Sequence, residues 1–367
     1  TKQMKVDFYI SSLSSGGAEH VLTNLAANFA EHGEDVSVTS YEKRPQFYSV
    51  ADGVKLNKVN YNGKGKFLEW IYDFHATCRY LNQRKADVAI SFLSRCNFML
   101  ILAGLMSRTK VIVCDRNNLL RKYPKYVFQI TCFLYRFADT ICVQTNEMKS
   151  FYPAYLQKKI VVLENPLDFD EMGKQCVGQD IEKENTVISV GRLEKQKDFV
   201  TLIKSYKAVA EKHPSWKLKI FGQGNRREEL QNLIRKENLE ENVKLCGVTH
   251  TPFLEMKKAK VFVLSSFYEG FPNVLCEAMH AGLPCISTRC ECGPSELIDD
   301  GRSGFLVPIG NVDVLSEKIM ALIEDENLRN ELGKNAEIAT ERLKLETICR
   351  KWRELAYSVC GKELKNE

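Results

Sequence analysis

The sequence predicts an α/β protein with two Rossmann-like, doubly wound domains in tandem. Three observations predict this class. The chain has 367 residues, more than one hydrophobic core usually holds. Short apolar runs alternate with helix-like stretches in both halves, as in parallel βαβ units. A polar stretch at mid-chain separates the two series and marks a domain boundary between about 166 and 185.

The first domain is expected to span residues 1–170. Its first strand is the apolar run "KVDFYI", which a glycine loop and a helical pattern follow. The later strands are expected at 35–40, 87–93, 110–115 and 139–145, with helical stretches at 67–83 and 127–138. The run "VVLENPLDF" then ends this half.

The second domain is expected to span 171–345. Its strands are predicted at 186–191, 218–224, 243–248, 261–266 and 284–289. Parallel sheets bind ligands beyond the carboxyl ends of their strands, so both domains are expected to present loops to a cleft between them. The last segment, 346–367, has helical spacing and either packs back on the first domain or caps the second.

Composition excludes several classes of protein. The 13 cysteines are scattered through strand- and helix-like stretches, which favours reduced thiols over a disulfide framework. Cys285, Cys290 and Cys292 lack paired zinc-ligand spacing, so no metal is expected. The longest apolar runs are too short for a membrane helix, and the N-terminal residues lack a signal-peptide layout. We therefore expect a cytoplasmic protein, and no nucleic-acid partner.

Positive charge is concentrated in the first domain, where residues 1–170 carry 22 Lys and Arg against 16 Asp and Glu. Lysines precede aromatic residues at 64–74 and are interleaved with them at 121–128. Such stretches suit an anionic membrane surface or a phosphate-bearing partner. The alternative is a solvated helix face over a core stripe at positions 67, 71, 74, 78 and 81.

Two loops at predicted strand ends have the composition of anion sites. Gly16 and Gly17 open a helix after the first strand, without the dinucleotide pattern and with no acidic residue ending the next strand, which argues against NAD. Gly191, Arg192 and Lys197 stand near a helix start, where the helix dipole favours anions over cations. Bound phosphate would explain the two cations. The alternative for Gly16 and Gly17 is a tight structural turn. The alternative for Arg192 and Lys197 is a basic patch on the protein surface.

The remaining loops follow three later strands of the second domain. Gly222 and Gly247 would let a flat ring or a phosphate approach the backbone, although each signal is weak alone. Glu269 lies in a loop between a strand and a helix, and Glu277 lies about a turn into that helix. A carboxylate in such a loop accepts hydrogen bonds from sugar hydroxyls. A solvent-exposed helix-start charge would explain Glu277 but not Glu269.

Together these motifs resemble the retaining glycosyltransferase family 4 of the GT-B fold. The residues that carry the resemblance are "EGFPNVLCEAMHAGLP", "GRLEKQKDF", "IFGQG", "GPSEL", "GRSGFLVP" and "SSGGAE", so it spans nearly the whole chain. The chain is particularly similar to bacterial enzymes that extend lipid-linked glycans, including N-acetylgalactosamine transferases.

The resemblance implies a role for each matching position. Arg192 and Lys197 would hold the diphosphate of a nucleotide sugar, Glu277 the ribose hydroxyls and Glu269 the donor sugar. Further donor contacts would come from loop positions, namely Gly16, Gly17, Gly191, Gly222, Gly247, Val248, Gly270, Phe271, Pro272 and Asn273.

One loop departs from the family pattern. Many relatives have a histidine after the fourth strand that reaches toward the donor sugar, and here the loop reads "CDRNN" from Cys114. Asp115 or Arg116 is the candidate substitute, which puts in doubt any sugar-specificity rule that rests on the histidine. Glu19 and His20 are further candidates for the acceptor or the sugar.

The implied activity is transfer of a hexose or N-acetylhexosamine from a UDP-sugar to a lipid-linked or surface glycan, with retention and without metal or cofactor. The acceptor would be held by the basic first domain, at the inner face of the membrane. Two alternatives are a sugar-nucleotide epimerase of the same fold and a non-catalytic nucleotide-sugar-binding protein. The choice of UDP over GDP is implied by the resemblance alone.

Overall fold

A computed structural model describes residues 3–14, 17–41, 48–116 and 124–364. The chain divides into two compact units. The first unit comprises Thr1–Pro166 and Leu345–Glu367, and the second comprises Leu167–Lys344. The sheet of each unit has the doubly wound α/β order that the sequence predicts.

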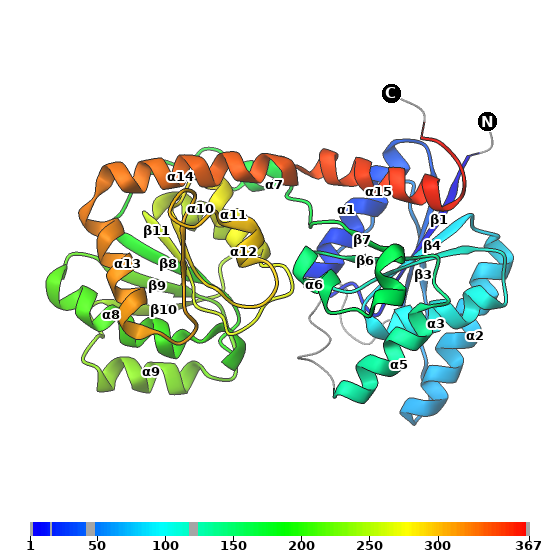
Figure 1. Cartoon of the computed structure of the whole chain (residues 1–367), viewed down its shortest axis with the longest axis horizontal. Helices are drawn as coiled ribbons and strands as arrows, with labels where there is room; N and C mark the ends of the chain where they lie inside the picture. Colours follow the sequence, from blue (N-terminus) through cyan, green and yellow to red (C-terminus); the bar gives the residue numbers. More distant parts are fainter. Residues whose placement is uncertain (1–2, 15–16, 42–47, 117–123, 365–367) are drawn as a thin grey trace. The chain divides into compact units, whose positions relative to one another are not determined.

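The first unit is built on a parallel sheet with the strand order β3-β2-β1-β4-β5-β6-β7 (Figure 1). Its strands are β1 (Lys5–Ile10), β2 (Asp35–Ser40), β3 (Lys55–Lys58), β4 (Val88–Phe92), β5 (Lys110–Cys114), β6 (Thr140–Val143) and β7 (Ile160–Val162). The order reverses between β1 and β4, so the loops beyond the carboxyl ends of these two strands diverge.

Helices cover both faces of this sheet. They are α1 (Gly17–Glu31), α2 (Lys66–Arg84), α3 (Ser94–Leu105), α5 (Lys125–Tyr135), α6 (Asn146–Ser150), the 3-10 helix η1 (Ala154–Lys159) and α15 (Leu345–Val359). Helix α15 packs beside α1, whereas α3 packs against both α2 and α5 (Figure 1).

The last helix completes the core of the first unit. Ile348, Cys349 and Trp352 are buried in the same hydrophobic cluster as the strand residues Phe8 and Phe92. The apolar stripe of α15 is thus covered by the first unit, although the helix follows the second unit in sequence.

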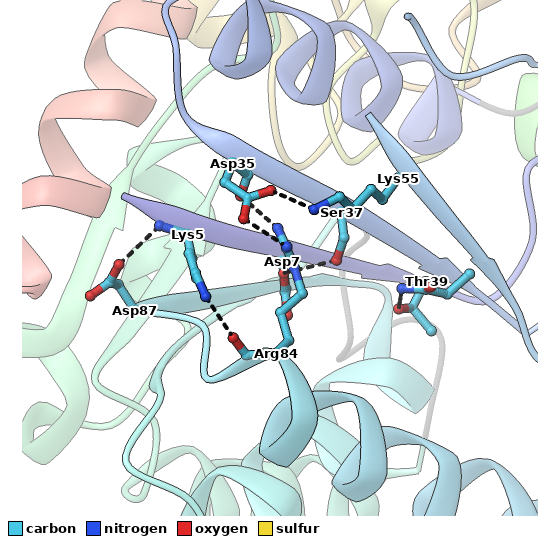
Figure 2. A network of polar contacts seen from close by, with 9 residues as sticks. Lys5, Asp7, Asp35, Ser37, Thr39, Lys55, Arg84 and Asp87 are labelled. Atoms are coloured by element: carbon cyan, nitrogen blue, oxygen red, sulfur yellow. Dashed lines mark hydrogen bonds and ion pairs between the residues drawn. The ribbon is translucent and has the colours of Figure 1, made fainter. Parts of the chain in front are cut away.

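A charged network joins the end of α2 to the strands beside it (Figure 2). The Arg84 guanidinium donates to Asp7 Oδ1 at 2.8 Å and to Asp35 Oδ2 at 2.9 Å. Ser37 Oγ also donates to Asp7, at 2.8 Å. Burial raises the pKa of Asp7, although the hydrogen bond from Arg84 opposes this shift. Arg84 therefore balances a carboxylate that is enclosed within the sheet.

The second unit repeats the same plan, with the strand order β10-β9-β8-β11-β12-β13. Its strands are β8 (Thr186–Val190), β9 (Lys217–Phe221), β10 (Val243–Gly247), β11 (Val261–Leu264), β12 (Cys285–Thr288) and β13 (Phe305–Val307). The order reverses between β8 and β11, which are hydrogen-bonded neighbours. The sequence analysis did not foresee β13, β3 or β7, which are three to four residues long.

The helices of the second unit pack around this sheet. They are α7 (Phe169–Lys174), α8 (Phe199–Lys212), α9 (Arg227–Lys236), α10 (Pro252–Lys258), α11 (Asn273–His280), α12 (Pro294–Leu297), α13 (Val312–Glu324) and α14 (Glu326–Thr340), with the 3-10 helices η2 (Lys195–Lys197) and η3 (Glu341–Leu343).

The second unit begins at Leu167, within the stretch that the sequence assigned to the first domain. Leu167 and Met172 are buried in its core, and the ring of Phe169 stacks on His280 at 3.6 Å between centroids. These residues belong to the second unit because their apolar side chains pack into its hydrophobic core.

All 13 cysteines are free thiols, including Cys285, Cys290 and Cys292. Within the described ranges, no three His, Cys, Asp or Glu side chains are grouped so as to hold a metal ion. No helix in the described part of the chain is long and apolar enough to cross a membrane.

Candidate active site

The second unit brings a lysine and a glutamate together where its strand order reverses. Lys197 Nζ lies 2.7 Å from Glu269 Oε1, and the two side chains are 13% and 7% exposed. Ser266 Oγ donates a second hydrogen bond to the same carboxylate oxygen, at 2.6 Å. The loops after β8 and β11 thus meet in a largely buried ion pair, at the point where this fold class binds its ligands.

The backbone holds both loops in place. The Phe267 N–H donates to the Gln196 carbonyl at 2.8 Å, and Ser265 Oγ donates to the Lys197 carbonyl at 2.8 Å. Thr288 Oγ1, at the end of β12, donates to the Ser266 carbonyl at 2.6 Å. The ion pair is therefore fixed before any ligand binds, which limits the reorganisation that binding requires.

Two glycines permit this arrangement. A Cβ on Gly191 would lie 3.2 Å from the Lys197 side chain, so the lysine stem passes directly over the backbone of Gly191. A Cβ on Gly222 would lie 1.9 Å from the Gly191 carbonyl oxygen. Gly222 is required by this contact between protein backbones. The approach of a ligand to Gly222, which the sequence suggested, stays a prediction.

Arg192 differs from Lys197 in its exposure. Its side chain is 68% exposed, and its Nη1 lies 3.1 Å from Glu194 Oε1. An exposed ion pair of this kind contributes at most about 1 kcal/mol. An anion that approaches the loop can therefore displace Glu194 from Arg192 at little cost.

Glu277 lies in the second turn of α11 and is only partly exposed. Burial raises the pKa of Glu277 to about 7. No hydrogen bond or ion pair engages its carboxylate within the described residues. A desolvated carboxylate without a donor is suited to accept hydrogen bonds from the hydroxyls of a ligand.

The loop before α11 contains four further residues that the sequence analysis predicted to contact the donor. Phe271 is buried in the core, Pro272 caps the N-terminus of α11, and Asn273 is its first residue. Gly270 lies between this group and Glu269. Across the sheet, the Gly247 carbonyl accepts from the Gly222 N–H at 2.7 Å, and Val248 beyond it is 56% exposed.

In the first unit, the loop after β1 leads into α1. Gly17 is the first residue of α1, and Gly16 lies outside the described residues. Glu19 is buried and accepts from Ser14 Oγ at 3.2 Å. The ring of His20 stacks on Tyr48 at 5.3 Å between centroids.

Asp115 is engaged in a buried polar network directly after β5. Its Oδ1 accepts from the Tyr135 hydroxyl at 2.7 Å and from Asn97 Nδ2 at 3.2 Å, and its Oδ2 accepts from the Tyr152 hydroxyl. The side chain is 1% exposed. This network gives Asp115 a structural role, and the sugar contact that the sequence analysis considered for it stays a prediction.

Arg116 is also buried, but it has few partners. Its Nη1 donates to Asn165 Oδ1, and its guanidinium carbon lies 4.1 Å from the centroid of the Phe92 ring. Its Nε and Nη2 have no hydrogen-bond partner among the described residues. Burial lowers the pKa of Arg116. The first unit thus holds a desolvated cation at the carboxyl edge of its sheet.

Two neighbours of these residues were not foreseen from the sequence. Ser266 completes the hydrogen bonding of Glu269, and Gln144 donates to Asn165 Oδ1 at 2.6 Å. The one signal in the sequence for these two residues was a hydroxyl or an amide side chain shortly after a buried strand. Such residues are too common at strand ends for that signal to select them.

The fold and this ion pair define a class of protein: a two-unit α/β protein with a largely buried ion pair at the strand reversal of its second unit. The match to known families makes the class specific. Residues 177–338 match the family "Glycosyl transferases group 1", and residues 15–171 match "Glycosyltransferase Family 4". The chain belongs to this glycosyltransferase family and has the GT-B fold, as the motifs predicted.

Three similar proteins extend these matches. An alpha-1,4-N-acetyl-D-galactosaminyltransferase of Campylobacter jejuni, named for its GalNAc-GalNAc-diNAcBac-PP-undecaprenol acceptor, is 30% identical over 97% of this chain and 99% of its own. A second transferase from that organism, a 4-alpha-N-acetylgalactosaminyltransferase named for a diphospho-undecaprenol acceptor, is 28% identical over 89% and 92%. Anabaena HepE, solved in complex with UDP, aligns with a TM-score of 0.80 and 19% identity over 97% of this chain and 100% of that one.

Proposed function

We propose that this glycosyltransferase moves an N-acetylhexosamine, GalNAc in the first instance, from a UDP-sugar to a polyprenyl-diphosphate-linked glycan, with retention at the anomeric carbon. The Lys197–Glu269 ion pair at the strand reversal of the second unit is the observation that carries the proposal. It sets a fixed cation and a fixed carboxylate side by side, as a sugar diphosphate needs. Membership of a transferase family weighs against an epimerase or a non-catalytic binding protein.

The proposed mechanism uses the charges of the site to stabilise the leaving group. The bond between the anomeric carbon and the diphosphate oxygen breaks, and Lys197 and Arg192 neutralise the charge that develops on the diphosphate. The acceptor hydroxyl bonds to the same face of the carbon, and its proton passes to the departing phosphate oxygen. Glu269 would bind donor-sugar hydroxyls, and Glu277 the ribose.

The identity of donor and acceptor is proposed from the relatives. Both Campylobacter transferases are named for GalNAc transfer to an undecaprenol-linked glycan, and the HepE crystal contained UDP. The proposed location is cytoplasmic and peripheral, with the basic first unit toward an anionic membrane surface. We further propose that the reaction needs no metal ion, and retention of activity in EDTA is the expected result.

The first experiment measures UDP release from a panel of UDP- and GDP-sugars, with and without a short polyprenyl-diphosphate saccharide. The variants are Lys197→Met and Glu269→Gln. Lys207→Met is the matched control, since Lys207 forms a 2.9 Å ion pair with Glu237 elsewhere in the second unit. We expect acceptor-dependent release with one donor, lost in both site variants and unchanged in the control.

Two results would contradict the proposal. Release of nucleotide only from GDP-sugars would show that the donor is a GDP-sugar and not a UDP-sugar. Full activity of Lys197→Met would remove the ion pair from the mechanism. If no donor is turned over, calorimetry with UDP separates a missing acceptor from a protein that does not bind the nucleotide.

A further inference from the structure

Helix α5 carries a row of exposed apolar side chains along its outer face. Tyr126, Ile130 and Phe133 lie three or four residues apart, and Phe137 continues the row just beyond the helix. Their exposed fractions are 63%, 55%, 53% and 48% in chain order. Residues at this spacing lie on one side of a helix, so the four form a continuous stripe.

A tyrosine and an arginine extend the stripe onto the next segment. Tyr155 in η1 is 57% exposed. The guanidinium carbon of Arg136 lies 5.8 Å from the Phe133 ring centroid and 5.6 Å from that of Tyr155, so the cation bridges the two rings. We call Tyr126, Ile130, Phe133, Phe137 and Tyr155 the α5 face. Large apolar side chains grouped in this way on a protein surface mark an interaction site.

The start of α2 also exposes aromatic and apolar side chains beside positive charges. Phe67, Leu68 and Tyr72 are 73%, 55% and 45% exposed, and Lys64 and Lys66 beside them are exposed as well. The sequence had left open a core stripe that began at Phe67, and this exposure excludes it there. Helices α2 and α5 both pack against α3, so the two basic and aromatic stretches belong to one helical layer (Figure 1).

The charged residues of helix α5 and its ends are all positive. Residues 124–138 contain no Asp or Glu, whereas Lys125 at the start of the helix and Arg136 at its C-terminal cap are exposed. Lys159 Nζ donates to the carbonyls of Arg136 and Ala138, at 2.7 and 2.8 Å. The first carboxylate that follows, Asp139, is paired with Lys110 at 2.9 Å.

We infer that the α5 face is the surface by which this protein docks on an anionic lipid bilayer. Its tyrosines are amphipathic and suit the headgroup level, its phenylalanines and Ile130 are apolar and suit the acyl chains below it, and its cations meet lipid phosphates. A second copy of the chain is a poor partner, because a two-fold interface would set the same cations against one another without a carboxylate. The inference deepens the proposed membrane association by naming its surface.

The test is co-sedimentation with vesicles of phosphatidylcholine that contain about one third phosphatidylglycerol. The variant is Ile130→Gln with Phe133→Gln, whose exposed side chains are replaceable without loss of the core. We expect its partition into the vesicle pellet to fall at least about tenfold. The control is Ile338→Gln in α14, since Ile338 is 59% exposed on a helix of the second unit. It should pellet like the wild type.

Three outcomes would overturn the inference. The first is equal sedimentation of the double variant and the wild type. The second is no sedimentation of the wild type at low salt. The third is a wild-type oligomer in light scattering that the double variant dissociates, which would make the α5 face a self-interface. The assay needs no turnover, so its result is separate from that of the transfer assay, and UDP affinity should be the same in all three proteins.

Discussion

Lys197 and Arg116 are both largely buried cations beyond the carboxyl edge of a parallel sheet, one in each unit, but their surroundings differ. Lys197 has the carboxylate of Glu269 at 2.7 Å. Arg116 has an amide oxygen and an aromatic ring, and no ion pair among the described residues. A buried cation with a carboxylate is held in a charge-balanced site, whereas one without a carboxylate remains available to an anion.

The comparison shows that burial alone does not define the role of a cation. In the second unit, charge balance fixes the position of the lysine, and the removal of either partner should leave an unbalanced charge. In the first unit, the arginine is desolvated without compensation, which is unfavourable for stability. Such an arrangement is expected where a group serves a ligand more than it serves the fold. The predictions below separate these cases, beginning with the largest effect.

Replacing Lys197 with methionine should have the largest effect. We expect kcat/KM to fall by about a thousandfold because the developing charge on the diphosphate loses its fixed cation. The free energy of unfolding should fall by about 3 kcal/mol because Glu269 stays buried without a partner. Adding Glu269→Gln should restore stability but not activity, and urea unfolding with steady-state kinetics measures both. Recovery of activity in the double variant would contradict this account.

Replacing Arg84 with methionine tests a paired arginine within the first unit. Asp7 would lose its hydrogen bond from Arg84 and remain 1% exposed (Figure 2). We expect a loss of about 3 kcal/mol in the free energy of unfolding. Asp7→Asn in the Arg84→Met background should recover part of that loss, because the residue left at position 7 is then neutral. An Arg84→Met protein as stable as the wild type would show that this network contributes little.

The pKa of Glu277, raised to about 7, predicts a pH dependence of donor binding. Hydrogen bonds from ribose hydroxyls favour the ionised carboxylate, so affinity for a UDP-sugar should rise by about tenfold between pH 6 and pH 8. A UDP-sugar is used because its diphosphate does not titrate in this range.

The same shift has the opposite sign for stability. A carboxyl whose folded-state pKa is raised binds its proton more tightly in the folded protein than in the unfolded one. Its contribution to the free energy of unfolding is therefore greatest below the ordinary value of 4.5 and is lost as pH rises through about 7. Glu277→Gln should remove the Glu277 component of both dependences. Calorimetry of the variant at three pH values checks this, and an unchanged affinity profile would refute the assignment.

Replacing Arg116 with methionine should have the smallest effect on stability. Methionine keeps much of the contact with Phe92, and Asn165 Oδ1 retains its hydrogen bond from Gln144 at 2.6 Å. We expect the free energy of unfolding to stay within about 1 kcal/mol of the wild type or to rise. A loss as large as that of Arg84→Met would make Arg116 a structural residue. If stability is kept while transfer activity falls, the unpaired arginine acts on a ligand.

The longer apolar strands and the loops that follow them were predictable from the sequence because their signals are local. Strand β3 was not, since "KLNK" lacks an apolar run and all four of its residues are exposed or only partly buried. The core stripe that the sequence left open for α2 also differs at its start, which the pattern places at Phe67. Asp73 is buried there because Arg95 lies 2.5 Å from its carboxylate, whereas Phe67 is exposed. A hydrophobicity pattern cannot anticipate a polar residue that is buried with its partner.

The sequence by itself determined the two series of parallel strands, the family motifs and the concentration of positive charge in the first half. Tertiary structure decided which charges have partners. Lys197 and Glu269 are 72 positions apart and meet because β8 and β11 are neighbours in the sheet. The arginine at position 116 lies against Phe92 and near Trp352, whose helix joins the first unit from the far end of the chain. Partners so distant in sequence are brought together only by the order of the strands and by the core that each helix completes.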